Sequence, residues 1–133
     1  MNIDQMFDQL KNIRDFMANV THWEEIQPKE ASYGPFPDSL NPELIRVLAD
    51  KGISRLYSHQ AKAIELAGRG KNLVVVTPTA SGKTLCYNLP VVNTILNNDD
   101  ARALYLFPTK ALSQDQVSEL HEMLSRLDHP IKS

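Results

Sequence analysis

The segment Leu73-Val-Val-Val-Thr-Pro-Thr-Ala-Ser-Gly-Lys-Thr84 decides the fold of this 133-residue chain. Its first part is a short, continuously apolar and β-branched run, which is typical of a strand buried on both faces of a parallel sheet. Small residues follow and lead to Gly82, Lys83 and Thr84. Converging backbone N–H groups, a helix N-terminus, a lysine and a hydroxyl are what a bound phosphate and its Mg²⁺ require. The segment therefore predicts a strand, a phosphate-binding loop and a helix.

The chemistry of phosphate binding gives the residues of this loop separate roles. Gly82 permits close approach of the backbone, Lys83 supplies positive charge to a transferring phosphoryl group, and Thr84 is the predicted Mg²⁺ ligand. Thr77 stands where the common G-x-x-x-x-G-K-[ST] pattern has its first glycine. We predict Lys83 and Thr84 as catalytic residues. The predicted cofactor-binding residues of the loop are Thr79, Ala80, Ser81, Gly82, Lys83, Thr84 and Leu85.

The pattern after the loop continues an α/β fold. A predicted helix over residues 84–97 leads to a second apolar run at 103–107, which we expect to be another buried strand. A further helix is expected over 113–127, opened by a capping box of Ser113 and Gln116. Strand, helix, strand and helix in this order predict a right-handed parallel unit.

The residues before the loop predict helices and a restrained connection. Apolar residues recur at helical spacing over 3–20, and a proline-rich stretch covers 27–42. Asn41 and Pro42 then begin a short helix, and another helix is expected over 58–67. We therefore expect a helical and proline-rich extension at 1–40 and the α/β part at 41–133.

The composition excludes several classes of protein. One cysteine, Cys86, excludes an internal disulfide framework and a zinc site built from several thiolates. The longest aliphatic run is 73–76, far short of the roughly 20 residues that cross a bilayer. We therefore expect no membrane partner and a cytoplasmic location. The net charge of −2 gives no polycationic footprint, so nucleic-acid binding has to be argued from motifs.

Two segments beside the loop carry a family resemblance. Gly52-Ile-Ser-Arg-Leu-Tyr-Ser-His-Gln60 resembles the adenine-recognising Q motif, and Pro108-Thr-Lys-Ala-Leu112, with Gln114 and Gln116, resembles motif Ia. Together with the loop they resemble superfamily 2 DEAD/DEAH-box DNA helicases, and most of all the bacterial mitomycin repair factor A helicase group. The fold implied is the N-terminal part of a RecA-like P-loop NTPase lobe, a parallel sheet flanked by helices, preceded by a helical N-terminal extension.

The resemblance implies roles for residues outside the loop. Gln60 would pair with the adenine edge and Tyr57 would stack on the base of ATP. The implied partner is single-stranded DNA or a 3′-tailed duplex, contacted mainly at its backbone by Pro108, Thr109, Lys110 and Gln114. The implied activity is an ATP-dependent DNA helicase with 3′ to 5′ translocation in DNA repair, using ATP and Mg²⁺.

The family's DEAD/DEAH box follows a buried strand, and no acidic stretch of this sequence does so. We therefore expect the 133 residues to be an N-terminal fragment that is inactive in hydrolysis, with the remaining strands and second lobe of a helicase as its partner. Two alternatives stay open. One is a P-loop kinase or a GTPase, and the other is a non-catalytic nucleotide-binding remnant.

Overall fold

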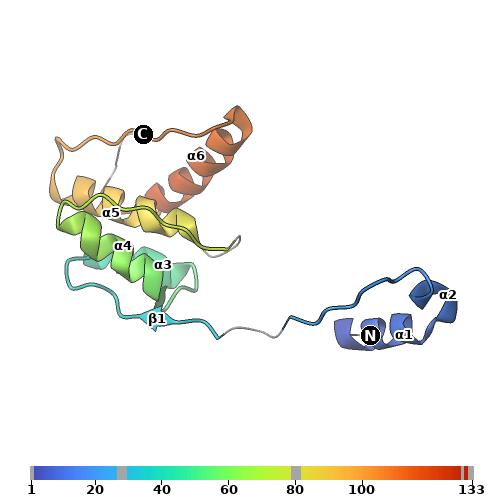
Figure 1. Ribbon diagram of the computed structural model, residues 1–133. Helices are drawn as coiled ribbons and strands as arrows, with labels where there is room; N and C mark the ends of the chain where they lie inside the picture. Colours follow the sequence, from blue (N-terminus) through green and yellow to red (C-terminus); the bar gives the residue numbers. More distant parts are fainter. Residues whose placement is uncertain (1, 27–29, 79–81, 130, 132–133) are drawn as a thin grey trace. The chain divides into compact units, whose positions relative to one another are not determined.

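The structure is a computed structural model that describes residues 2–26, 30–78, 82–129 and 131. The chain divides into two compact units, Met1–Glu30 and Ala31–Ser133, whose elements are labelled in Figure 1. Within the described residues, no helix has the length and apolar character needed to cross a membrane.

Residues 2–26 of the first unit form two helices, α1 (Ile3–Asn12) and α2 (Arg14–Met17). Asn2 and Gln5 form a capping box at the start of α1, each side chain accepting from the other residue's backbone N–H. The single helix expected over 3–20 is wrong, because Ile13 has the extended conformation φ −85°, ψ 108°. Trp23 contacts α1 through Phe7, edge to face at 5.9 Å, so the chain after α2 folds back within this unit.

The described residues of the second unit form four helices, and three of them begin close to the expected positions. They are α3 (Pro42–Asp50), α4 (Ser58–Gly68) and α5 (Lys83–Asn97). The fourth, α6 (Lys110–Leu124), begins three residues before the expected start. The Leu112 N–H donates to Thr109 Oγ1 at 3.2 Å, so Thr109 is the N-cap. The capping box predicted at Ser113 is therefore wrong, and Ser113 lies inside the helix.

The core of the second unit lies among these four helices, with α4 packed along α5 (Figure 1). Strand β1 (Tyr33–Gly34) pairs antiparallel with β2 (Leu56–Tyr57), which brings residues 33 and 34 against α4. The buried core residues are Leu40, Leu44, Val47, Leu48, Leu56, Ile64, Leu89, Val92, Met123 and Leu124.

The two apolar runs predicted as strands are extended, and no described strand pairs with either of them. Figure 1 shows residues 71–78 and 98–109 both returning past α5 in the direction opposite to the helix. Among the described residues the only ladder is β1–β2, so the expected parallel sheet is not formed there. Val74, Val76, Leu104 and Leu106 are 89%, 87%, 84% and 83% exposed, whereas Leu73, Val75, Tyr105 and Phe107 are half-buried.

Exposed and half-buried side chains thus alternate along both segments, as in strands that pack against the rest of the protein with one face only. A cavity of about 570 Å³ separates the two extended segments and is floored by α5, with Leu73, Val75 and Ala103 among its lining residues. Each segment therefore has the side-chain alternation of a strand, and no described strand pairs with it in a ladder.

We expect the 133-residue chain to self-associate through these segments. Burying each of these exposed aliphatic side chains would contribute roughly 1.5–3 kcal/mol of free energy. A strand-like segment that is not in a ladder is also a template on which another chain can pair. Replacing Val74, Val76, Leu104 and Leu106 together by Thr, which keeps β propensity, is expected to give a monomer. Sedimentation velocity over rising protein concentration measures the association. A wild-type chain that stays monomeric throughout would contradict the expectation.

Candidate functional site

Helix α5 begins directly after Gly82, whose backbone is left-handed with φ 68°. A side chain at this position would be strained, and its Cβ would lie 2.6 Å from Gln60 Nε2. Gly82 therefore allows both the turn into α5 and the close approach of Gln60. Thr79, Ala80 and Ser81, which were predicted to contact the cofactor, lie outside the described residues.

The Lys83 side chain turns back toward the segment that precedes the loop. Its Nζ donates to the backbone oxygens of Thr77 at 3.0 Å and Pro78 at 2.8 Å. The ammonium therefore lies close to both ends of the predicted phosphate loop. A cation at the N-terminus of α5 adds to the positive end of the helix dipole, which favours an anion at this place.

The Thr84 side chain lies in the first turn of α5 and contacts α6. Its hydroxyl donates to Gln116 Oε1 at 3.3 Å, and the Tyr87 hydroxyl donates to the same oxygen. A hydroxyl that donates its hydrogen keeps its oxygen lone pairs for a cation. Across the described part of the chain no group of three or more His, Cys, Asp or Glu could hold a metal ion. A Mg²⁺ at this place would take most of its ligands from a nucleotide and from water, and the Thr84 oxygen could supply one more.

The predicted adenine-binding residues lie at the junction of β2 and α4, next to Gly82. The Gln60 side chain is 2% exposed and bonded at both ends. Its Oε1 accepts the Tyr57 N–H at 2.9 Å, and its Nε2 donates to the Gly82 carbonyl oxygen at 2.9 Å. This amide joins the residues predicted for adenine to the residues predicted for phosphate, 22 positions further along the chain.

Three aromatic rings stack beside this amide. The Tyr57 ring stacks with the Tyr33 ring at a centroid distance of 5.3 Å and with the His59 ring at 5.6 Å, with nearly parallel planes in both pairs. The guanidinium of Arg55 lies 4.1 Å above the Tyr33 ring. Sequence reasoning missed Tyr33, because its place in the stack depends on the β1–β2 pairing of Tyr33 with Tyr57.

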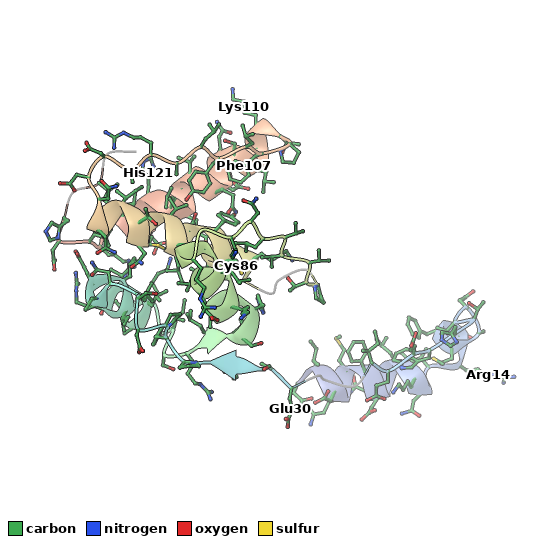
Figure 2. All side chains as sticks on the ribbon, turned by 60° about the vertical axis from the view of Figure 1, so that its left-hand side comes forward. Arg14, Glu30, Cys86, Phe107, Lys110 and His121 are labelled. Atoms are coloured by element: carbon green, nitrogen blue, oxygen red, sulfur yellow. The ribbon has the colours of Figure 1, made fainter. Side chains whose placement is uncertain are left out.

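The residues predicted to contact a nucleic-acid backbone lie at the start of α6. Figure 2 shows Lys110 at this end of the helix with its side chain directed away from the unit. Pro108, Thr109 and Gln114 are exposed as well. Because Thr109 caps α6 with its hydroxyl, the first backbone N–H groups of the helix and the Lys110 ammonium share one exposed end.

Two titratable side chains lie at α5: Cys86 belongs to the helix and is buried, and Tyr105 packs on Tyr87 of the helix. Burial raises the pKa of the Cys86 thiol, so the thiol stays protonated near neutral pH, as expected for a buried hydrophobe rather than a nucleophile. Burial, with a smaller contribution from Tyr87, raises the pKa of Tyr105 to about 12. The Tyr105 hydroxyl is buried and has no hydrogen-bond partner among the residues that the structure describes, and its ring packs against Tyr87 and Phe107.

A left-handed glycine followed by lysine and threonine at the start of a helix, after an extended apolar segment, defines a P-loop nucleotide-binding protein. Residues 57–133 match the DEAD/DEAH box helicase family, and the chain belongs to that family. Membership favours a helicase over the kinase and GTPase alternatives.

Several curated and solved proteins are similar to the chain. The "Uncharacterized ATP-dependent helicase YprA" of Bacillus subtilis (strain 168) is 51% identical over 86% of this chain and 15% of that protein. The "ATP-dependent helicase HRQ1" of Saccharomyces cerevisiae (strain ATCC 204508 / S288c) is 34% identical over 94% of this chain and 11% of that protein. A crystal structure of the DUF1998 helicase MrfA bound to DNA and AMPPNP has a TM-score of 0.89 and 46% identity, covering 100% of this chain and 18% of that one. The chain thus spans less than a fifth of the length of these relatives.

The contact between Gly82 and Gln60 predicts an unequal effect of two alanine substitutions. Gly82→Ala and Gly52→Ala both place a side chain at positive φ, which costs about 1–2 kcal/mol. Nothing lies within 4 Å of the Gly52 Cβ position, so Gly52→Ala is the matched control. Gly82→Ala should lose about 1–3 kcal/mol more in the free energy of unfolding, because the Gln60 amide has to give up its partners.

Denaturant unfolding measures this difference. In a Gln60→Ala background the two glycine substitutions should cost the same. Equal losses in the wild-type background would contradict the account of the contact.

Proposed function

We propose that the chain forms the ATP-binding part of an ATP-dependent DNA helicase. The nucleotide lies with its adenine at Tyr57 and Gln60 and its phosphates at the start of α5. Gly82, Lys83, Thr84 and Leu85 hold the phosphate side together with Thr79, Ala80 and Ser81. Thr84 supplies one ligand to Mg²⁺, which neutralises phosphate charge when it is bound with the nucleotide.

The single observation that carries this proposal is the buried Gln60 amide. It bonds to Tyr57 and Gly82 at the same time, so the stacking residue and the head of the phosphate helix belong to one small site. The Lys83 ammonium lies at the other end of that site, near the Thr77 and Pro78 carbonyls. In this proposal residues 57–60 recognise the adenine, Lys83 binds the phosphates and Thr84 binds Mg²⁺. These residues follow one another along the chain in the same order as the parts of ATP–Mg²⁺ that they bind.

A second part of the proposal is a DNA backbone site at the start of α6, formed by Pro108, Thr109, Lys110 and Gln114. The exposed helix N-terminus and the Lys110 ammonium suit a phosphodiester, and such contacts position a strand without reading its sequence. The similar MrfA helicase was crystallised with DNA, which supports this choice of ligand. The 3′ to 5′ direction, the single-stranded substrate and a role in repair are proposed on the family resemblance alone.

We also propose that residues 73–77 and 103–107 are strands of a parallel sheet that further strands complete. The cavity between them and their bare outer side chains support this arrangement. The division at residue 40, a cytoplasmic location and the lack of hydrolysis by the 133 residues alone stay predictions. The remaining alternative, a non-catalytic nucleotide-binding remnant, predicts nucleotide binding without hydrolysis.

The nucleotide site is tested by calorimetric titration of the chain with ADP and GDP in Mg²⁺. We expect selective binding of ADP, lost by at least tenfold in Lys83→Ala, because the phosphates lose their cation, and in Gln60→Ala, because the adenine edge loses its amide. Lys71→Ala, which removes an exposed lysine away from the loop, is the matched control and should bind ADP normally. Wild-type affinity in Lys83→Ala, or equal binding of GDP, would contradict the assignment.

The DNA site is tested by the salt dependence of binding to single-stranded oligothymidylate. Each phosphate contact contributes about 0.7 to the slope of log K against log salt concentration. Lys110→Ala should lower the magnitude of this slope by about 0.7, the contribution of one contact. It should weaken binding to oligonucleotides of other sequences by the same factor. Lys62→Ala, which removes an exposed lysine paired with Glu65 on α4, should leave the slope unchanged. An unchanged slope in Lys110→Ala would remove this residue from the site.

A further inference from the structure

The side chain of Gln116 joins α6 to the first turns of α5. Its Oε1 accepts the Thr84 hydroxyl at 3.3 Å and the Tyr87 hydroxyl as well. Thr84, Tyr87 and Gln116 are all half-buried. The amide oxygen has two lone pairs, so the two hydroxyls use its full capacity as an acceptor.

A threonine that ligates a cation does so through an oxygen lone pair, and its hydroxyl hydrogen then has to point at an acceptor elsewhere. Gln116 supplies that acceptor from the α6 side. The hydrogen of Thr84 is therefore directed at α6, and its lone pairs are directed away from α6. Fixing a ligand through its other hydrogen bond is how residues behind a metal site set its geometry.

The acceptor is itself held in place from two directions. The Tyr87 hydroxyl fixes the amide oxygen, and the Tyr87 ring packs edge to face on Tyr105 at 5.9 Å. The backbone of Gln116 lies six residues into α6, about 9 Å along a helix that Thr109 caps. A side chain held by packing and by a helix keeps one orientation, which is what a positioning group requires.

We propose that Gln116 is a positioning residue that sets the Thr84 hydroxyl for Mg²⁺ when a nucleotide binds. The inference rests on the proposed nucleotide site and adds a residue that lies outside the phosphate loop. A positioning role affects one quantity and not another. It should change the increase in nucleotide affinity caused by Mg²⁺, and it should leave the affinity without metal unchanged.

The test measures the affinity of the 133-residue chain for ADP by calorimetry, with Mg²⁺ and with EDTA in its place. In Gln116→Leu, which removes the acceptor, the gain from Mg²⁺ should fall by about tenfold or more, the usual cost of losing a group behind a metal ligand. Gln116→Glu keeps an oxygen acceptor and should retain most of the gain. Ser118→Leu introduces the same side chain at an exposed position of α6 and should behave as wild type.

Three results would overturn the inference, and they are distinguishable. An unchanged gain from Mg²⁺ in Gln116→Leu would remove the positioning role and leave the proposed nucleotide site intact. An equal loss of affinity with Mg²⁺ and with EDTA would show that Gln116 only maintains the fold. A wild-type chain that does not bind ADP would contradict the proposed function, and the inference would fall with it.

Discussion

The arrangement of the site depends on two hydrogen bonds made by one buried amide, that of Gln60. These bonds fix the direction in which the turn before α4 meets the start of α5, which apolar packing by itself does not do. Each bond also satisfies a backbone group, and leaving such a group unpaired in a buried place costs about 1–3 kcal/mol. The bond to Gly82 requires a residue without a side chain, since a Cβ would lie 2.6 Å from the amide nitrogen. One glutamine and one glycine therefore set the distance between the aromatic stack and the phosphate helix.

The Gln60 amide can hold the protein backbone and still take part in the proposed adenine recognition. A carboxamide offers two lone pairs and two N–H groups, and the protein bonds to Tyr57 and Gly82 use one of each. Bonds to the described residues thus use one acceptor and one donor, and the other acceptor and donor of the amide have the pattern that an adenine edge requires. Gln116 has a similar role at the proposed Mg²⁺ position, where its side-chain oxygen accepts a hydrogen bond from the Thr84 hydroxyl. In the proposed nucleotide site, two amides from distant parts of the sequence would thus hold the two ends.

Local patterns predicted the parts of the fold that local interactions determine. Asn41 followed by Pro42 fixed the start of α3, and Gly82-Lys-Thr84 predicted the start of α5. The start of α6 was misplaced because Thr109 and Ser113 are both able to cap a helix, and only the Leu112 N–H bond decides between them. Strands 73–77 and 103–107 could be predicted as extended and apolar, but pairing requires neighbours that their own residues do not specify. The contacts of Tyr33 with Tyr57 and of Gln116 with Thr84 span 24 and 32 positions, beyond any sequence periodicity.

The central claim is that residues 57–60, 82–87 and 109–116 form one linked site. Hydrogen–deuterium exchange of the chain, with and without ADP and Mg²⁺, tests it most directly, because amide protection reports opening of each segment separately. The account predicts that the nucleotide raises protection in all three segments together, with residues 42–50 of α3 unchanged. Protection confined to 82–87, with no change at 57–60 and 109–116, would contradict it.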